Sequence, residues 1–373
     1  MSAVRQILFT AGMGGYRVHH VPGIVRTSRG VVVVSTEARY SRRAGKDEPN
    51  PDYRDHDILI RRSADGGATW LPQQVVLSHR DFGAGPLHNF QMIADRSGRI
   101  HALVLHDYTR LFYLSSDDDG ATWSAPFKKQ DVLERFRERY PWKAFATGCG
   151  HGIQLRSGRL LVPVWMSDNS LAPHRPSDAA TVFSDDGGAN WQAGDFVCRS
   201  NDVYRWPSES MAAELPDGHV MINLRNESDA RRRLVSVSPD GISRWSLPQF
   251  AKELLEPVCE GAMLAFPDPR NPAKTLLAFS NPHSQERKHV DPAGNKSDRV
   301  NLQLKISTDL GQTWPISHAI EPGPANYSDM CAMPDGSLLV VFSCGMQGSD
   351  IHDSAFTVVE RIDIEKILTG GEH

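Results

Sequence analysis

The chain has 373 residues, of which 40% are hydrophobic and 23% are charged, and it carries 30 glycines and 24 prolines. This length fits one large β domain or two ordinary domains, and the composition is that of a turn-rich globular protein. The net charge of −4 excludes a strongly basic surface for nucleic acid or an anionic membrane. The longest purely aliphatic run, Val31–Val34, is far shorter than the roughly 20 residues that span a bilayer.

The chain start and the cysteines indicate a cellular compartment. The first residues, MSAVRQILFTAGMGG, contain one arginine and a broken apolar stretch, unlike a secretory signal peptide. The five cysteines are odd in number, widely spaced and without a CxxC pair: Cys149, Cys198, Cys259, Cys331 and Cys344. We therefore expect reduced thiols and a cytoplasmic location.

The first element that recurs along the chain is a tight turn followed by an aliphatic strand. A glycine after a polar residue, followed by β-branched and aliphatic residues, is typical of a β-hairpin. The pattern occurs as SRGVVVV (28–34), RSGRIHALVL (96–105), RSGRLLVPV (156–164), PDGHVMINL (216–224), PDGSLLVVF (334–342) and, in a longer form, PDPRNPAKTLLAF (267–279). The sequence therefore predicts six hairpins.

The second recurring element is an eight-residue stretch, which we call the box. Its copies are SADGGATW (63–70), SDDDGATW (116–123), SDDGGANW (184–191), STDLGQTW (307–314) and a worn version, SPDGISRW (238–245), which lacks the glycine at the fifth place. Successive copies in chain order start 53, 68, 54 and 69 residues apart. Repeats of this length indicate a propeller or an array of small sheets.

The residues inside the box are those of a turn. An aspartate accepts hydrogen bonds from nearby backbone N–H groups, a glycine adopts positive φ, and a tryptophan fills the neighbouring apolar layer. We therefore interpret the box aspartates as structural and not catalytic.

Hairpins and boxes together predict the architecture. Five of the six hairpins run on into a box, and each hairpin–box pair has enough residues for a four-stranded sheet. The sequence thus predicts an all-β fold, a six-bladed β-propeller whose last blade is closed by a strand from the N-terminus, in a single domain over 1–373. Short surface helices are predicted at Gln130–Tyr140, Phe250–Glu256 and Ile364–Leu368.

Candidate site residues should come from several blades, because the inner strands and the loops at one end of a propeller channel build its site. Polar and aromatic residues that stand out at strand ends are Glu37, Arg39, Asp52, Asp55, Asp57, Glu209, Arg225, Arg299 and Tyr327.

These residues, in this order and between these boxes, resemble the exo-α-sialidases (neuraminidases) of the bacterial and animal type, which carry Asp-box (BNR) repeats. The resemblance runs from about Tyr16 to Phe342. It implies a propeller fold and a glycoside hydrolase that acts on a terminal sialic acid.

The resemblance also implies roles for individual residues. The loop DYRDHDILIRRS is similar to the acid/base loop of the family, whose aspartate stands nine or ten residues before a basic pair. Asp52 fits that spacing best, and Asp47 and Asp55 are alternatives. Tyr327 in YSD corresponds to the nucleophile, and Glu209, sixteen residues before Arg225, to the glutamate that polarises it.

The remaining correspondences concern substrate binding. Arg225 and Arg299 match the second and third arginines of the triad that binds the sugar carboxylate. Arg39, with Glu37 in STEAR, matches a further substrate contact. Asn89 and GCGHGIQL (148–155) lie in segments that also look like the family.

The chemistry of these residue types supports this set. Sialic acid carries a carboxylate on its anomeric carbon, so a carboxylate nucleophile would meet a like charge. A neutral tyrosine that an adjacent glutamate deprotonates avoids this repulsion. Arginine binds a carboxylate through two parallel hydrogen bonds. An aspartic acid whose pKa is raised by burial would donate a proton to the leaving oxygen.

A structural interpretation exists for each of these residues. Asp52 could be a solvated loop carboxylate, Glu209 a partner in a strand-end ion pair, and Tyr327 a packed channel aromatic. Arg225 and Arg299 could pair with structural carboxylates. Six histidines show no metal-ligand spacing, and we interpret them as ordinary buried or solvated histidines: His19, His20, His88, His101, His106 and His151.

Two departures from the family bear on the substrate. The first arginine of the triad is expected in a YRIP-like motif, but this chain reads GYRVHHVPGIV (15–25). Without a gap His20 takes that position, and with a three-residue insertion Arg17 does. Ser343 stands where the family has a glutamate that supports this arginine. A different acidic sugar, such as another 2-keto acid, is therefore an alternative substrate.

The sequence as a whole predicts a sialidase-like retaining exo-glycosidase that needs no cofactor and no metal. Its partner would be a sialoside or a related acidic sugar, and neither nucleic acid nor membrane. A non-catalytic box-repeat propeller that binds glycans or proteins is the alternative from another class. It predicts that Tyr327 and Glu209 lie beyond hydrogen-bond reach. Linkage preference, pH optimum and oligomeric state stay open.

Overall fold

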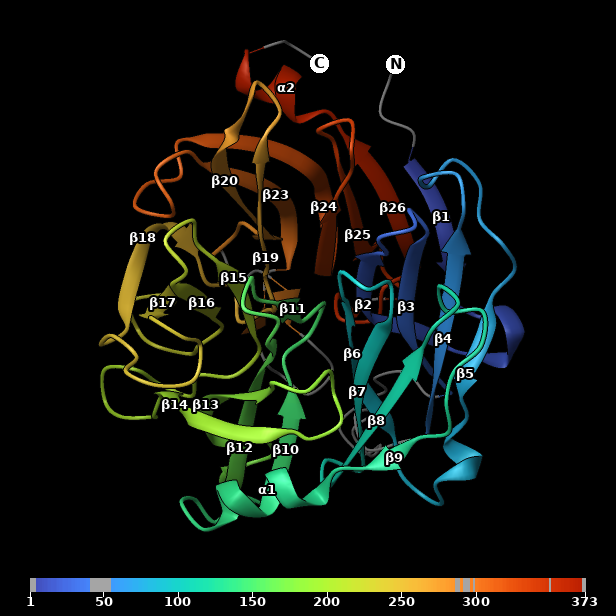
Figure 1. The fold of residues 1–373 in the computed structure, drawn as a ribbon, viewed down its shortest axis with the longest axis vertical. Coiled ribbons are helices and arrows are strands. Elements are labelled where there is room, and N and C mark those ends of the chain that lie inside the picture. The colour runs from blue at the N-terminus through green and yellow to red at the C-terminus, as the bar shows by residue number, and fades with distance from the viewer. Residues whose placement is uncertain are drawn as a thin grey trace.

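The structure is a computed structural model, and it describes residues 5–40, 55–285, 289–290, 296–297, 299–348 and 350–370. Figure 1 shows the sheets arranged in a ring that the chain follows in order, from blue on the right through green and yellow to red at the top. The β-propeller that the sequence predicted is confirmed in this arrangement.

Each large sheet is antiparallel, and its neighbouring strands mostly follow one another in the chain. The first sheet holds β2 (Val18–Arg26), β3 (Val32–Arg39), β4 (His56–Ser63) and β5 (Gln74–Leu77). The second holds β6 (Leu87–Ala94), β7 (Ile100–His106), β8 (Arg110–Ser116) and β9 (Phe127–Lys128).

The next two sheets continue this pattern. The third holds β10 (Ala144–Thr147), β11 (Ile153–Gln154), β12 (Leu160–Ala172), β13 (Arg175–Ser184) and β14 (Gln192–Cys198). The fourth holds β15 (Ser210–Glu214), β16 (Val220–Leu224), β17 (Arg232–Ser238) and β18 (Gln249–Leu255).

The last large sheet has seven strands in the order β1-β26-β25-β24-β23-β20-β19. Its members are β1 (Arg5–Thr10), β19 (Ala262–Asp268), β20 (Asn271–Pro282), β23 (Val300–Ser307), β24 (Ile316–Ala332), β25 (Leu338–Cys344) and β26 (Phe356–Ile362). The strand β24 pairs with β23 through its first half and with β25 through its second half. The described residues therefore form five large sheets instead of six separate ones, because β24 continues from one four-stranded half into the next.

The N-terminal strand closes the ring as the sequence predicted. Arg5 lies opposite Glu360 and Thr10 opposite Phe356 in the pairing of β1 with β26. The first and last strands of the described chain, β1 and β26, consequently lie in the same sheet (Figure 1).

The smaller elements lie at the periphery or in loops. They are the helices α1 (Gln130–Arg137) and α2 (Ile364–Leu368), the 3-10 turns Met13–Gly15 and His79–Asp81, and the two-stranded sheet of β21 (His289–Val290) and β22 (Lys296–Ser297). Two of the three predicted helices are confirmed, α1 being shorter than Gln130–Tyr140. The prediction of a helix at Phe250–Glu256 is wrong, because most of this segment belongs to β18, which pairs with β17. Strand pairing at the sheet edge overrides its local helical pattern.

Apolar cores fill the spaces between consecutive sheets. For example, Ile58 and Ile60 of the first sheet pack with Met92 and Val104 of the second. The box tryptophans contribute one side chain each to these cores: Trp70, Trp123, Trp191, Trp245 and Trp314. Each sheet is thus packed on both faces against its neighbours, which makes the ring rigid.

The box geometry confirms its role as a turn. In the first copy Ser63 Oγ accepts a hydrogen bond from Gly67 N at 2.7 Å. Asp65 accepts from Thr69 N at 2.9 Å and from Thr69 Oγ1 at 2.6 Å. Each of these hydrogen bonds joins two residues that are four positions apart.

The worn copy forms the same turn with one residue fewer. Gly241 N donates to Ser238 Oγ at 3.0 Å, so Gly241 replaces the missing fifth-place glycine one position earlier. Ser243 takes the place of the threonine and donates to Asp240 through its N at 2.9 Å and its Oγ at 3.1 Å.

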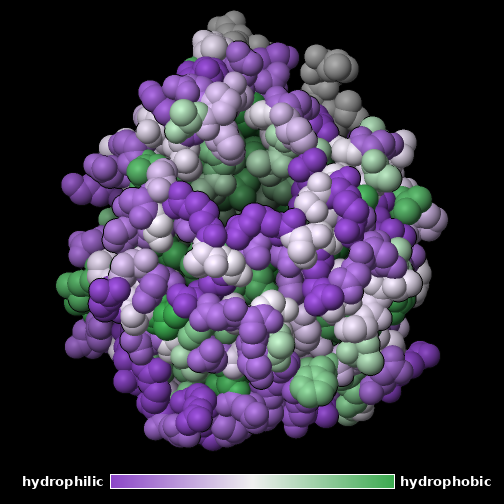
Figure 2. Space-filling view, viewed as in Figure 1, coloured by the Kyte–Doolittle hydropathy of each residue, from purple (hydrophilic) through white to green (hydrophobic). Residues whose placement is uncertain are grey.

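The surface seen in Figure 2 is largely hydrophilic, with a hollow in its upper half in which hydrophobic side chains are visible. No helix among the described residues has the length and hydrophobicity needed to cross a membrane. All five cysteines are buried and free of disulfides.

Candidate active site

The predicted site residues from several sheets converge at the strand ends that lie away from the boxes. Glu209 immediately precedes β15 and Arg225 immediately follows β16, and the Arg225 N–H donates to the Glu209 carbonyl at 2.9 Å. Arg299 immediately precedes β23, and Tyr327 lies within β24. Antiparallel pairing brings these positions to one end of the channel, although 118 residues separate Glu209 from Tyr327.

Tyr327, Glu209 and Arg225 form a three-member hydrogen-bonded cluster. The Tyr327 hydroxyl donates to Glu209 Oε1, and Arg225 Nη1 donates to Glu209 Oε2. Arg225 Nη1 also lies 3.1 Å from the Tyr327 hydroxyl. Only 12% of the Glu209 side chain and 15% of the Arg225 side chain are exposed, so these charges interact in a largely desolvated environment.

The electrostatics of this cluster assign its protons. Burial alone would raise the pKa of Glu209, but the charge of Arg225 and the hydrogen bond from Tyr327 lower it. Burial and the charge of Glu209 hold the pKa of Tyr327 well above its usual value. At neutral pH Glu209 is therefore an ionised acceptor and Tyr327 a neutral donor.

Arg299 lies on the other side of Tyr327. Its guanidinium carbon is 5.4 Å from the centre of the Tyr327 ring. Its Nη2 donates to the Val258 carbonyl at 2.9 Å, and its Nη1 lies 3.3 Å from Asn326 Oδ1. Among the described residues, the buried Nε atoms of both Arg225 and Arg299 lack a hydrogen-bond partner. Two cations thus flank the tyrosine with donor capacity left for an anion.

The structure distinguishes the two sequence candidates for the first triad position. His20 is buried, and its ring lies 4.7 Å from the Tyr327 ring, centre to centre. Arg17 is exposed, and its backbone N–H donates to the Arg39 carbonyl. The residue beside Tyr327 is therefore His20 and not Arg17. The structure also has Ser343, in β25, fully buried.

Glu37 and Arg39 lie near His20 at the end of β3, where Glu37 is opposite His20 in the strand pairing. Arg39 Nη2 is 2.7 Å from Glu37 Oε2, and Glu37 Oε1 accepts from Asn89 N at 2.7 Å. The Asn89 side chain donates to the Thr147 carbonyl at 2.6 Å, just before GCGHGIQL. These predicted contacts therefore form one buried polar network.

Asp52 and Asp47 lie outside the described residues. Asp55 is half exposed, with its carboxylate 3.6 Å from His79 Nε2. Asp57 accepts hydrogen bonds from the Tyr16 and Tyr40 hydroxyls and from His79. Burial opposes ionisation, but these bonds lower the pKa of Asp57. Asp57 therefore serves the structure of this loop.

Several residues around Tyr327 were not predicted from the sequence. Cys149 and Cys259 pack against Tyr327. Glu260 is buried, accepts a hydrogen bond from Ser328 N at 3.1 Å, and has a pKa raised well above the usual value by burial. Apolar residues surround Glu260 in the sequence without a periodic pattern, so no local signal marks it.

A buried ion pair lies one step further along β24. Asp329 is two residues after Tyr327, and its Oδ1 is 2.7 Å from His151 Nδ1. Asp329 Oδ2 also accepts from Ile24 N at 2.8 Å. Residues two apart share one face of a strand, so the sequence YSD could have indicated that Asp329 also faces the channel. The sequence analysis interpreted His151 as an ordinary histidine, and in the structure it forms this internal pair with Asp329.

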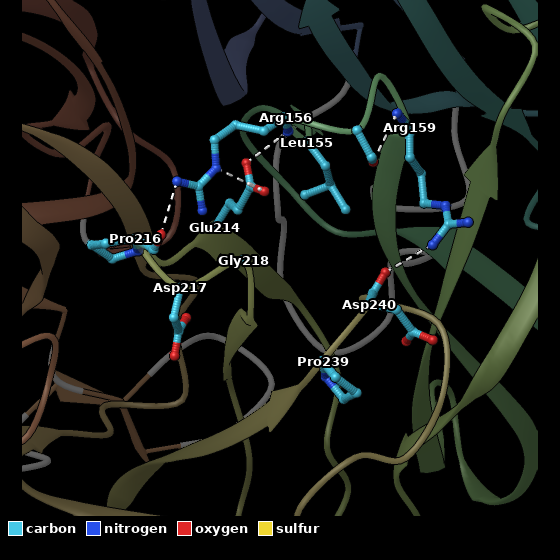
Figure 3. A pocket seen from close by; sticks show the side chains of 10 residues that line it. Leu155, Arg156, Arg159, Glu214, Pro216, Asp217, Gly218, Pro239 and Asp240 are labelled. Carbon is cyan, nitrogen blue, oxygen red and sulfur yellow. Dashed lines mark hydrogen bonds and ion pairs between the residues drawn. The ribbon is translucent and has the colours of Figure 1, made fainter.

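A surface pocket of about 400 Å³ lies at the opposite ends of the strands, among the hairpin turns and the worn box. Figure 3 shows Arg156 directed toward Glu214 and Pro216, and Arg159 toward Asp240. Arg156 is 3.3 Å from Glu214, and Arg159 is 2.7 Å from Asp185. Both of its arginines are ion-paired with carboxylates.

Comparison with known proteins places this geometry in a family. The model of the BNR repeat-like domain matches residues 43–340. The chain belongs to the sialidase family with BNR repeats. The family resemblance inferred from the boxes and the strand-end residues is thereby confirmed.

Curated members of this family include bacterial and animal proteins. The chain is 30% identical to a sialidase of Micromonospora viridifaciens over 91% of its own length and 52% of the relative. It is 28% identical to Sialidase-2 of Cricetulus griseus over 94% of each chain. The chain thus spans about half the length of the Micromonospora relative and nearly all of the animal one.

Solved structures show the same fold. The Hadza microbial sialidase Hz136 superposes with a TM-score of 0.75 at 24% identity, over 95% of this chain and 67% of that one. The Trypanosoma rangeli sialidase in complex with 2,3-difluorosialic acid, described as a covalent intermediate, has a TM-score of 0.72 at 17% identity, over 100% of this chain and 60% of that one.

Proposed function

We propose that this protein is a retaining exo-glycosidase that removes a terminal α-linked sialic acid from glycoconjugates. The observation that carries the proposal is the hydrogen bond from the Tyr327 hydroxyl to Glu209, with Arg225 bonded to both, in a chain of the sialidase family. This arrangement supplies a nucleophile, its base and a cation within one cluster.

In the first step the Tyr327 oxygen attacks the anomeric carbon and its proton passes to Glu209. Asp52, as general acid, protonates the departing glycosidic oxygen, so the bond to the aglycone breaks as the bond to tyrosine forms. In the second step Asp52, now a carboxylate, takes a proton from water, which displaces Tyr327. Glu209 returns its proton to the tyrosine. Two inversions at one carbon retain its configuration.

The charge balance of the site supports an anionic substrate. Glu209 is negative, and Arg225 and Arg299 are positive, so these three residues leave one positive charge beside Tyr327. A substrate carboxylate would neutralise this charge and accept hydrogen bonds from guanidinium N–H groups that have no partner among the described residues. Since these cations are largely buried, their attraction for a carboxylate exceeds that of surface arginines.

A second candidate function is hydrolysis of a different acidic sugar, such as another 2-keto acid glycoside. The placement of His20 beside Tyr327, where the family resemblance implies an arginine, favours it. A clamp of two arginines and a histidine offers fewer fixed donors to the carboxylate. A panel of 2-keto acid glycosides tests this alternative, and turnover of the sialoside alone would reject it.

The non-catalytic alternative is disfavoured by a direct contact. It requires Tyr327 and Glu209 to lie out of hydrogen-bond reach, whereas the hydroxyl of one donates to the carboxylate of the other.

Hydrolysis of a fluorogenic sialoside by the wild type and by Tyr327→Phe tests the proposal. The variant should lose at least about 10³-fold in kcat, because no nucleophile remains. Tyr204→Phe is the matched control, since its hydroxyl donates to the Pro248 carbonyl at 2.8 Å, away from Tyr327 and Glu209. Equal activity of wild type and Tyr327→Phe would reject the assignment. Mass spectrometry after incubation with 2,3-difluorosialic acid should find the adduct on the peptide that contains Tyr327.

A further inference from the structure

We propose that Arg233 and Glu256, a fully buried ion pair behind the site, are positioning residues that hold Arg225 and Arg299 at the spacing needed to bind a carboxylate. This inference rests on the proposed function, because it assigns Arg225 and Arg299 to the substrate carboxylate. Neither residue of the pair was singled out by the sequence pattern.

Glu256 connects the two arginines through backbone hydrogen bonds. On one side its Oε2 accepts from the backbone N–H of Asn226 at 3.1 Å, directly after Arg225. On the other side its Oε1 accepts from the N–H groups of Val258 at 2.7 Å and Cys259 at 3.2 Å. One carboxylate thereby anchors the end of β16 to the loop that follows β18.

That loop holds Arg299. The Val258 carbonyl accepts from Arg299 Nη2 at 2.9 Å, and Cys259 packs against Tyr327. Val258 has a φ of 62°, a conformation that β-branched residues rarely adopt. Hydrogen bonds from Val258 and Cys259 to Glu256 stabilise this otherwise unfavourable backbone, which directs the Val258 carbonyl at Arg299.

Arg233 fixes Glu256 in turn. Its Nη1 donates to Glu256 Oε2 at 2.8 Å and to the Cys259 carbonyl at 2.9 Å. Its Nε donates to Asn223 Oδ1 at 2.6 Å, two residues before Arg225 on β16. The planar guanidinium therefore spans β16 and the 256–259 loop at once, which the single ammonium of a lysine does not do.

The burial of the pair favours positioning over stabilisation as its role. Both side chains are at most 1% exposed. Desolvation of two charges offsets most of their attraction, so a buried pair is often no better for stability than packed apolar residues. What this pair supplies is direction, since five of its hydrogen bonds end either on residues that flank Arg225 or on the Val258–Cys259 loop that accepts a hydrogen bond from Arg299.

Arg233→Lys is the decisive variant, because it keeps the positive charge and removes the fork. We expect KM for a fluorogenic sialoside to rise about tenfold with a much smaller change in kcat, since misplacement of the clamp weakens ground-state and transition-state binding alike. Glu256→Gln should change KM in the same direction. Calorimetry with free sialic acid should show the matching loss of affinity.

Two controls separate positioning from general destabilisation. Arg270→Lys disrupts an arginine–carboxylate pair with Asp268 at the other end of the strands, 2.9 Å apart. Leu276→Ala removes a buried side chain of the core between β20 and its neighbours. Both should leave KM unchanged, even where the melting temperature falls as far as in Arg233→Lys.

The inference is overturned if Arg233→Lys, folded by circular dichroism, keeps the wild-type KM and the wild-type affinity for sialic acid. It is also overturned if Leu276→Ala raises KM as much. Failure of the proposed function looks different, because the wild type itself would then neither hydrolyse the sialoside nor bind sialic acid.

Discussion

The two ends of the strands are built in opposite ways. At one end, each box turn is stabilised by hydrogen bonds between residues four positions apart, such as Ser63 with Gly67 and Asp65 with Thr69. At the other end, Tyr327 meets Glu209 across 118 residues and His151 meets Asp329 across 178. The box end is a set of independent local structures, whereas the site exists only when the ring is closed.

The electrostatics of the two ends differ in the same sense. The box carboxylates lie near solvent and accept hydrogen bonds from residues of the same turn. These bonds lower the pKa to about 2 in Asp65, Asp118 and Asp240. Around Tyr327 the charged groups are buried, and burial raises the pKa of Glu260 well above its usual value. The box end thus pairs exposed carboxylates with local donors, whereas the charged groups beside Tyr327 are buried.

The largest expected effect is at the channel end. Glu209→Gln removes the base that accepts the Tyr327 proton, so kcat/KM should fall roughly 10²–10⁴-fold. Steady-state hydrolysis of the fluorogenic sialoside measures this effect, with near-ultraviolet circular dichroism to verify the fold. Retention of full activity would mean that the Tyr327–Glu209 contact is structural. It would contradict the assignment of a catalytic role to the channel end.

The next test concerns Glu260. A carboxyl whose folded pKa is raised gives up its proton more readily when unfolded, so the free energy of unfolding falls as pH rises above about 4.3. Glu260→Gln removes this titration. The variant should be more stable than wild type at pH 7–8, and the two should converge below about pH 4. Urea unfolding across this range measures the difference, and parallel pH profiles would show that Glu260 is ionised in the native protein.

A smaller effect is expected at the box end. Asp118 accepts from Ser116 Oγ at 2.8 Å and from Thr122 N at 2.8 Å. Asp118→Ala should lower the free energy of unfolding by about 1–2 kcal/mol without changing kcat/KM per folded molecule. Asp117→Ala is the control, because its exposed pair with Arg99 contributes little. A loss of activity in Asp118→Ala at full folding would show that the two ends are coupled.

The smallest effect is in the acid range. Because folding lowers the pKa of Asp118 to about 2, its contribution to stability is complete above about pH 4 and is lost as pH falls toward 2. The unfolding free energy of wild type should therefore decline over this window, and that of Asp118→Ala should decline less. Identical slopes would contradict the role assigned to the box carboxylate.

The fold was largely predictable from the sequence, and its exceptions are instructive. Hairpin and box signals depend on residues a few positions apart, so they predicted the strands and their turns. The segment Phe250–Glu256 has a helical pattern, but most of it belongs to β18, because pairing with β17 decides its conformation. The merging of two sheets through β24 was not predictable either, since it depends on how a 17-residue strand bends between two partners.

The site was predictable in its members but not in its arrangement. Glu209, Arg225, Arg299 and Tyr327 were selected by their positions relative to hairpins and boxes, and the structure brings them together. The choice between Arg17 and His20 was not decidable from sequence, because it depends on which side chain packs against Tyr327, a residue of another sheet. Glu260 escaped notice because burial, and not a motif, gives it its chemistry.

The sequence by itself determined the repeat and the propeller, because these follow from short-range turn chemistry and strand periodicity, and its resemblance to the sialidase family supplied the residues of the candidate site. Only the tertiary structure decided that His20 lies beside Tyr327 and that Glu209 accepts a hydrogen bond from the tyrosine hydroxyl. It also decided that Arg233 and Glu256 form a buried pair behind the two arginines. The reason is physical: these contacts join residues from different sheets or from different strands of one sheet, and their energies depend on burial that exists only in the folded ring.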